Sequence, residues 1–204
     1  MSADSKFHVH HDAPVQVGRR ERLGVRLLIV ADGAFVFGMI FSYFYLRNLN
    51  ANNGWIPEGG HTLSASSGWV VVIPLIIAAV LHRIALRSGS ALKNISILTF
   101  IALLVGGYLQ WKQLAHMPFQ VPGEEGEEPM FGFEGSYASS WVLIAGANMF
   151  HYIIGAFVAL GVALRSRRND LNPVLEHWRH RTVSSWLTWI AISGIACAIT
   201  TSFI

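Results

Sequence analysis

The sequence predicts an all-α integral membrane protein built as one bundle of five transmembrane helices. Of its 204 residues, 52% are hydrophobic and 13% are charged, about half the charged share of an ordinary soluble domain. Five apolar windows approach the roughly 20 residues that a helix needs to cross the bilayer core. Short basic blocks separate these windows and alternate along the chain, a pattern typical of membrane topology rather than of nucleic-acid binding.

The polar segment 1–22 precedes the first apolar window, and we expect it to be a disordered cytoplasmic tail. It contains Pro14 and Gly18, and no small-residue cleavage site follows the first apolar run, so it does not resemble a signal peptide. Residues 23–204 are expected to form a single membrane domain, because the windows leave no room for a separate soluble one. The five helices are predicted at residues 23–46, 63–81, 95–111, 138–164 and 183–204.

The first three windows differ in their small residues and in their helix breakers. The first carries Ala34, Gly38 and Ser42 at helical spacing, which lets two helix backbones approach closely. The second contains Pro74 at mid-membrane, where a kink is tolerated. The third is the shortest, and its glycine pair at 106–107 lies within an apolar helix rather than in a phosphate-binding loop.

The fourth window repeats the small-residue pattern with Ala147, Gly155 and Ala159, and His151 lies on the same face. We expect these small residues to pack helices within the bundle and against a partner subunit. The fifth window contains Cys197, the only cysteine of the chain. A single cysteine excludes an internal disulfide and a cysteine-based metal cluster.

Lys and Arg residues in short loops predict the orientation, because these residues are retained on the cytoplasmic side. The tail carries four of them, and the loops after the second and fourth helices carry three and five. The loops after the first and third helices have only Arg47 and Lys112, at their edges. We therefore expect a cytoplasmic amino terminus, an external carboxyl terminus and an external acidic stretch at residues 123–134.

Two ionisable residues inside the windows are candidates for function, because a charge within hydrocarbon is costly. Asp32 follows Arg26 by six residues, or about 9 Å of helix rise, which predicts a position in the cytoplasmic half of the first helix. It is interpreted either as a structural hydrogen-bonding residue or as a group that handles protons or contacts a partner. His151 lies near the middle of the fourth helix, and a haem b would need a second histidine at matching depth. We therefore interpret His151 as a hydrogen-bonding interior residue rather than as a metal ligand.

Motifs of catalysis and transport are missing from the sequence. The chain contains no GxSxG, Walker A, HExxH or Ser-His-Asp pattern, and no internal repeat or recurring broken helix typical of secondary transporters. We therefore predict no catalytic residue, no metal site and no cofactor in this chain.

The first helix contains the string ADGAFVFGMIFSYF, which starts at Ala31. This string resembles the S-E-x-x-F-F-x-G-x-x-x-x-Y-F signature of haem-copper oxidase subunit III. Asp32 stands in the place of the family's intramembrane glutamate, one carboxylate for another. The positions that match in register are Phe35, Gly38, Tyr43 and Phe44.

The third and fourth helices extend the resemblance. The family's L-Q-A-x-E run, followed by P-F, is matched by residues 109–113 and 118–119, with Gln113 in place of the glutamate. In the fourth helix HYIIG, which begins at His151, resembles the family's H-V-I-I-G, and Gly146 is also in place.

Two departures from the family pattern lie in the last two helices. Asn148 occupies the place of the first histidine of the family's H-G-L-H. The W-H-F-x-D motif is missing from the fifth helix, where Trp186 and Trp189 are its only echoes. These changes indicate a divergent member.

The resemblance covers residues 20–204 and is closest to the short, five-helix bacterial form. It implies an accessory subunit that stabilises catalytic subunit I and supports proton uptake in aerobic electron transport, in the bacterial plasma (inner) membrane. Haem and copper would belong to the catalytic subunit, and the further partners would be other oxidase subunits and membrane lipids. A phospholipid would be bound in a cleft between the first two helices and the last three.

Three alternatives stand beside this reading. A subunit III-like accessory protein of nitric oxide reductase has the same fold. A haem-bearing electron carrier is disfavoured by the lone mid-membrane histidine. A small proton or ion transporter would use Asp32, and the absence of repeats and of a second buried charge disfavours it.

Overall fold

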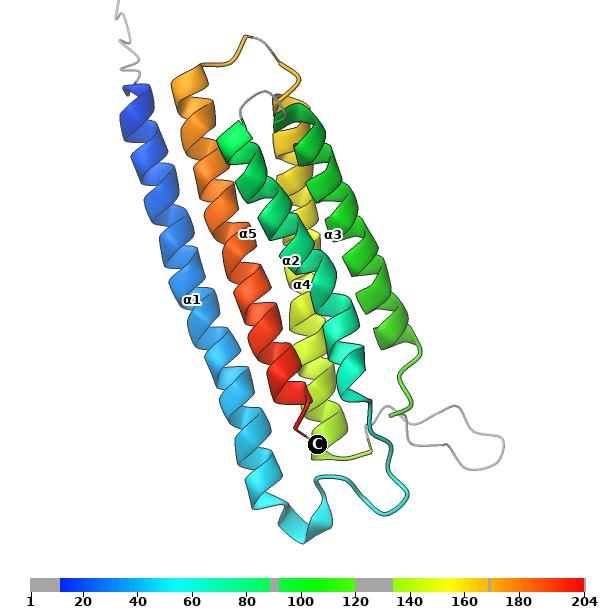
Figure 1. Ribbon diagram of the computed structural model, residues 1–204. Coiled ribbons are helices and arrows are strands. Elements are labelled where there is room, and N and C mark those ends of the chain that lie inside the picture. The colour runs from blue at the N-terminus through cyan, green and yellow to red at the C-terminus, as the bar shows by residue number, and fades with distance from the viewer. Residues whose placement is uncertain (1–11, 89–91, 120–133, 169, 204) are drawn as a thin grey trace, which may run out of the picture.

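The computed structural model describes residues 12–88, 92–119, 134–168 and 170–203. Five long helices fill most of these ranges, and a short 3-10 turn, η1 (Ala51–Asn53), follows the first of them. The long helices are α1 (Pro14–Leu49), α2 (Ala65–Ser88), α3 (Leu92–Ala115), α4 (Ser136–Arg165) and α5 (Pro173–Thr201). All five are long and apolar enough to cross a membrane, which confirms the predicted all-α, five-helix fold. Successive helices run in opposite directions along one bundle (Figure 1).

The bundle has two ends that we name by one residue each. The Trp55 end holds the α1–α2 connection, the end of α3 and the carboxyl terminus, and the Arg168 end holds the start of α1 and the α4–α5 connection (Figure 1). The Arg168 end is the one predicted to be cytoplasmic. Of the acidic stretch 123–134, only Glu134 falls within the described residues.

Helix α1 begins at Pro14, nine residues before the predicted start at Leu23, so the expected tail is helical from residue 14 onward. Proline suits the first turn of a helix, where its missing N–H leaves no hydrogen bond unmade. The extra turns pack against α5: Gly18 is buried, and a Cβ at this position would lie 2.5 Å from Trp178 Cγ. Residues 1–11 of the expected tail lie outside the described residues.

Helix α5 also begins earlier than predicted, at Pro173 instead of Val183. The Asn172 side chain caps it by accepting hydrogen bonds from the amides of Val174 and Leu175. The added turns meet the added turns of α1, where Arg179 forms an ion pair with Glu21 at 3.2 Å. Each extension therefore supports the other outside the apolar windows.

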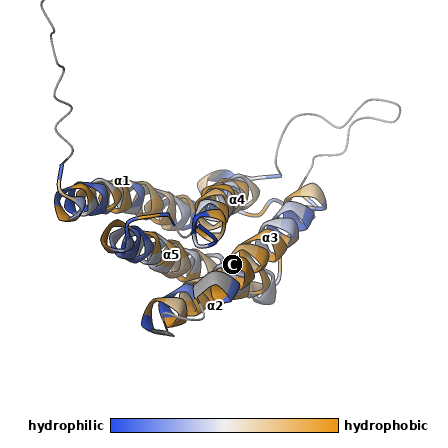
Figure 2. Ribbon diagram, turned by 90° about the horizontal axis from the view of Figure 1, so that it is seen from above, coloured by the Kyte–Doolittle hydropathy of each residue, from blue (hydrophilic) through white to orange (hydrophobic). Residues whose placement is uncertain are grey.

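Helix α5 lies between α1, α2 and α4, while α3 packs along α2 and α4 (Figure 2). This grouping corrects the cleft expected between the first two helices and the last three, because α2 packs closely on α3 and α5. Helix α1 packs instead on α5 and α4. The second helix therefore belongs with α3 and α5, and α5 separates it from α1 (Figure 2).

A tyrosine side chain from α4 contacts the backbone of α2 about one turn before Pro74. The hydroxyl of Tyr152 donates a hydrogen bond to the carbonyl oxygen of Val71. Gly106 of α3 makes room for this ring, because a Cβ on Gly106 would overlap it. Helices α2, α3 and α4 are therefore in close contact next to Pro74, where proline weakens the hydrogen-bond ladder of α2.

At the Trp55 end, two connections are joined by hydrogen bonds between His61 and Glu134. His61 Nδ1 lies 2.8 Å from Glu134 Oε1, and the His61 backbone amide donates to Oε2 at 2.8 Å. These hydrogen bonds hold the pKa of the Glu134 carboxyl below its usual range. The pair therefore supports the fold at neutral pH and is lost as the pH falls through that lowered pKa.

Candidate functional site

The two candidate ionisable residues, Asp32 and His151, are in direct contact. His151 Nε2 lies 3.1 Å from both Oδ1 and Oδ2 of Asp32. The histidine comes from α4 and the aspartate from α1, 119 residues apart in the sequence. The fold thus brings together the two ionisable candidates that belong to separate sequence motifs.

A third residue, Trp189 of α5, completes the contact. Its indole Nε1–H donates a hydrogen bond of 2.6 Å to Asp32 Oδ2. The ring also lies beside Gly33, where a Cβ would sit 3.4 Å from Trp189 Cη2. A side chain at position 33 would therefore be in ordinary van der Waals contact with the indole.

The site lies near mid-height in the bundle and is largely shielded. Asp32 is close to the midpoint of the 36-residue α1, and His151 is close to the midpoint of the 30-residue α4. The side chains of His151 and Asp32 are 5% and 14% exposed. The depth of Asp32 in the membrane, predicted in the cytoplasmic half, stays a prediction, because the turns of α1 before Leu23 are polar and lie outside the apolar window. On its other side, His151 meets Trp186 edge to face, with ring centroids 6.1 Å apart.

A carboxyl group and an imidazole at this distance can share one proton. With the proton on His151 the two residues form an ion pair, and with the proton on Asp32 both are neutral. Each form has no net charge, which limits the cost of placing the pair in hydrocarbon.

The four predicted packing positions lie in two different environments. Gly155 is buried, and a Cβ there would lie 3.2 Å from Ile190 Cδ1 of α5. Ala159, one turn further, is 2% exposed and belongs to the same apolar cluster as Ile190. Gly38 and Gly146 are exposed on the outside of the bundle, with no other group within 4 Å of a Cβ among the described residues. Internal packing thus involves the first pair, and the second pair faces outward, where a partner subunit is the remaining expected contact.

A chain of amide side chains links α2, α3 and α4 near the Trp55 end. Asn148 Nδ2 donates to Gln110 Oε1 at 2.7 Å. Gln110 Nε2 donates to Gln113 Oε1 at 3.0 Å, and Gln113 Nε2 donates to the carbonyl oxygen of Ser67 at 2.9 Å. Gln113 and Asn148, two departures from the family pattern, therefore lie at either side of Gln110 in one hydrogen-bonded chain.

Two further histidines meet at the Arg168 end. His82 of α2 is 1% exposed, its Nε2 lies 3.2 Å from the carbonyl oxygen of His180, and the two rings stack with centroids 5.8 Å apart. Among the described residues, no group of three or more His, Cys, Asp or Glu side chains is placed to hold a metal ion. The two histidines are thus a contact between α2 and α5.

Trp189 and the amide chain were not expected as site residues from the sequence. The tryptophan was noted only as an echo of a missing motif, because nothing in a linear sequence pairs an indole with a carboxylate 157 residues away. The sequence contained one indication of the amide chain: Gln113 and Asn148 are both neutral polar residues at positions where the family pattern has an ionisable one.

No family model matches the chain. Over 165 residues, the chain is 24% identical to the cytochrome c oxidase subunit 3 of Prototheca wickerhamii, an alignment that covers 77% of this chain and 59% of that protein. The chain therefore matches well under two thirds of the length of this relative.

Proposed function

We propose that the chain belongs to the haem-copper oxidase subunit III family and is an accessory subunit of a respiratory terminal oxidase. The contact between Asp32 and His151 is the observation that carries this proposal, since it unites two separately recognised family motifs at one point. The similarity to a cytochrome c oxidase subunit 3 and the five membrane-compatible helices support it.

Within that role the chain supports the catalytic subunit I and does not itself react with oxygen. We assign haem and copper to the catalytic subunit, because His151 Nε2 faces Asp32 in this chain. Asp32 and His151 give the subunit two contacting ionisable side chains within its membrane-spanning helices. We propose that this pair supports proton uptake by the complex, with the amino terminus cytoplasmic, in a bacterial inner membrane.

A bound phospholipid is part of the same proposal, at a different place from the cleft expected at first. An apolar groove of about 440 Å³ lies between α1, α4 and α5 toward the Arg168 end. Its walls include Val25, Val158 and Val183. Toward the Arg168 end it is lined by Arg165 and Arg179 together with Glu176 and Glu21, with which they form ion pairs. The aliphatic walls suit an acyl chain, and the charged end of the groove suits a zwitterionic headgroup at the membrane surface.

Purification of the tagged chain from its native membrane, followed by identification of partner chains and a haem spectrum, tests the proposal. We expect a haem-copper oxidase catalytic subunit to copurify with it. A nitric oxide reductase catalytic subunit would redirect the proposal to the related complex. Isolation without any haem protein, together with Asp32-dependent proton flux in liposomes, would favour the transporter and overturn the proposal.

A further inference from the structure

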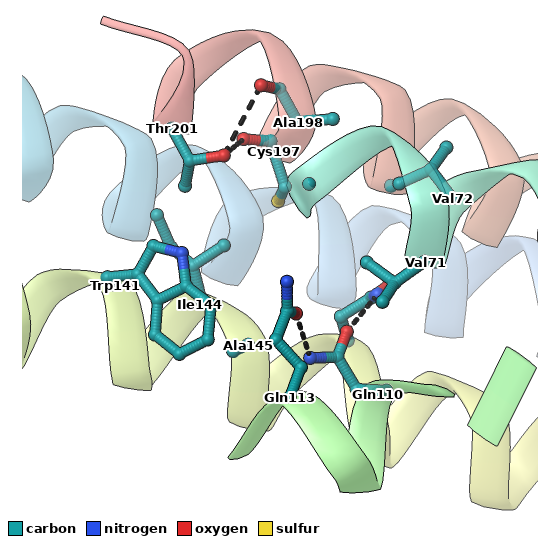
Figure 3. Close-up of a pocket in the computed structure, with 13 residues that line it drawn as sticks. Val71, Val72, Gln110, Gln113, Trp141, Ile144, Ala145, Cys197, Ala198 and Thr201 are labelled. Atoms are coloured by element: carbon teal, nitrogen blue, oxygen red, sulfur yellow. Dashed lines mark hydrogen bonds between the residues drawn. The ribbon is translucent and has the colours of Figure 1, made fainter. Parts of the chain in front are cut away.

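A small, partly open pocket lies among α2, α3, α4 and α5 near the Trp55 end (Figure 3). The centre of a water molecule can occupy a volume of about 20 Å³ within it. One water needs roughly 10–15 Å³ by the same measure. The cavity is therefore large enough for a single water molecule and too small for a lipid or an organic ligand.

One polar atom that borders this cavity lacks a partner. Asn148 is 5% exposed, and its Oδ1 has no hydrogen-bond partner in the described part of the chain. This oxygen faces α5, since a Cβ on Gly194 would lie 3.7 Å from it. A buried carbonyl without a donor costs several kcal/mol in a membrane interior, so a donor for Asn148 Oδ1 is needed.

Other groups that line the cavity have unused hydrogen-bonding capacity. The hydroxyl of Thr201 donates to the carbonyl oxygen of Cys197 at 3.1 Å, which leaves its own lone pairs able to accept. Gln110 Nε2 uses one of its two N–H groups on Gln113 and keeps the other. Both residues line the same cavity as Asn148, so two acceptors and one donor surround it.

We propose that this cavity is a binding site for one structural water molecule. The water donates hydrogen bonds to Asn148 Oδ1 and Thr201 Oγ1 and accepts one from Gln110 Nε2, which meets the usual two to four partners of a buried water. It extends the amide chain, which already runs from the Ser67 carbonyl at the Trp55 end to Asn148, as far as Thr201 of α5. Asn148 lies one helical turn from His151. The site is independent of the identity of the complex.

Cys197 allows a direct test, because it lines the cavity and is the only cysteine of the chain. Carbon-13 labelling at cysteine alone gives one signal in solid-state NMR spectra of the full chain in lipid bilayers. We expect magnetisation to pass from water protons to this signal, although Cys197 is only 8% exposed. No transfer at mixing times that suffice for residues in the solvent-exposed loops would overturn the proposal.

Two variants and one matched control sharpen the test. Asn148→Leu removes the acceptor, and Val72→Ile adds a methylene group to the cavity wall, so each is expected to abolish the transfer to Cys197. Asn94→Leu, the same kind of change at an exposed position of α3, is expected to leave it unchanged. We also expect Val72→Ile to lower the thermal midpoint, because Asn148 Oδ1 loses its donor. A higher midpoint for Val72→Ile, with transfer unchanged by either variant, would show that the water reaching Cys197 lies elsewhere and that this cavity is dry, and would refute the site.

Discussion

His151 Nε2 is equidistant from the two carboxylate oxygens of Asp32, at 3.1 Å from each. This arrangement joins α1 to α4 at mid-height, where most of the surrounding side chains are apolar. Trp189 adds a contact from α5 to the same carboxylate. Helix α1 is thus attached at its centre by a titratable pair.

Trp189→Phe should weaken this attachment without emptying the space of the ring. Phenylalanine keeps most of the aromatic contact and removes the N–H that donates to Asp32 Oδ2. Hydrogen bonds between membrane helices contribute about 0.6 kcal/mol on average and up to about 1.7 kcal/mol, and we expect a loss of stability in this range. Thermal unfolding in nanodiscs measures it, with Trp111→Phe on the exposed face of α3 as control. Equal midpoints for both variants would contradict the role of the indole N–H.

The neighbouring glycines of α3 make a matched pair for testing the contact with Tyr152. Gly106→Ala places a methyl group against the Tyr152 ring, whereas a Cβ at Gly107 would lie 3.5 Å from Tyr152 Cβ, an ordinary contact. Overpacking of this kind costs about 1–3 kcal/mol. We expect Gly106→Ala to lower the thermal midpoint clearly and Gly107→Ala to change it little. The reverse order would mean that Tyr152 does not pass beside Gly106.

One glycine that faces the bundle interior and one that faces outward allow folding of the chain to be tested separately from its assembly with a partner. Gly155→Leu drives a large side chain toward Ile190 and Leu103, so we expect the chain itself to lose about 1–3 kcal/mol of stability. Gly38→Leu meets no other group of the described chain and should leave thermal stability unchanged while weakening copurification with a partner that covers α1. Stability unaffected by Gly155→Leu would contradict the packing of α4 against α3 and α5.

The orientation is tested by reporters on both ends of the bundle. We expect a reporter fused after Ile204 to be external and one inserted at Arg168 to be cytoplasmic, because the basic residues gather at the Arg168 end. The measurement is the activity of a compartment-specific reporter. Both reporters on the same side would show that α5 does not span the membrane. A cytoplasmic carboxyl terminus with an external Arg168 would mean that an earlier helix does not span, with α3, which contains the shortest predicted window, as the first to question.

The helices themselves could be predicted from apolar length, but their ends could not. Segments 14–22 and 173–182 are polar, and they extend α1 and α5 beyond the length needed to cross the bilayer. Hydropathy therefore assigns them to tails and loops. They are helical because they pack on each other, through Gly18 against Trp178 and Glu21 against Arg179. Such pairing over more than 150 residues leaves no periodic signal within either segment.

Two residues of the candidate site could be predicted from the sequence, but their arrangement in space could not. Asp32 and His151 could be identified because ionisable residues are rare inside apolar windows. Their mutual contact, and the donor Trp189, depend on how α1, α4 and α5 are rotated about their axes. Small residues were an ambiguous signal for the same reason, since Gly155 faces the bundle and Gly38 faces away from it.

The proton-sharing pair is tested most directly by a double-mutant cycle on the purified complex. Asp32→Asn keeps the size of the side chain and its ability to accept from Trp189, but it cannot release a proton. His151→Gln keeps an amide near the position of Nε2 and removes the titratable ring. The readouts are proton stoichiometry and the number of turnovers before inactivation, with assembly checked by subunit composition.

If the two residues hold one shared proton, each single variant assembles and loses sustained turnover or proton coupling, and the double variant is no worse than the more impaired single one. Independent, additive losses would contradict a shared proton. Wild-type turnover and stoichiometry in Asp32→Asn, with failed assembly only in Asp32→Leu, would show that Asp32 is a structural hydrogen-bonding residue alone.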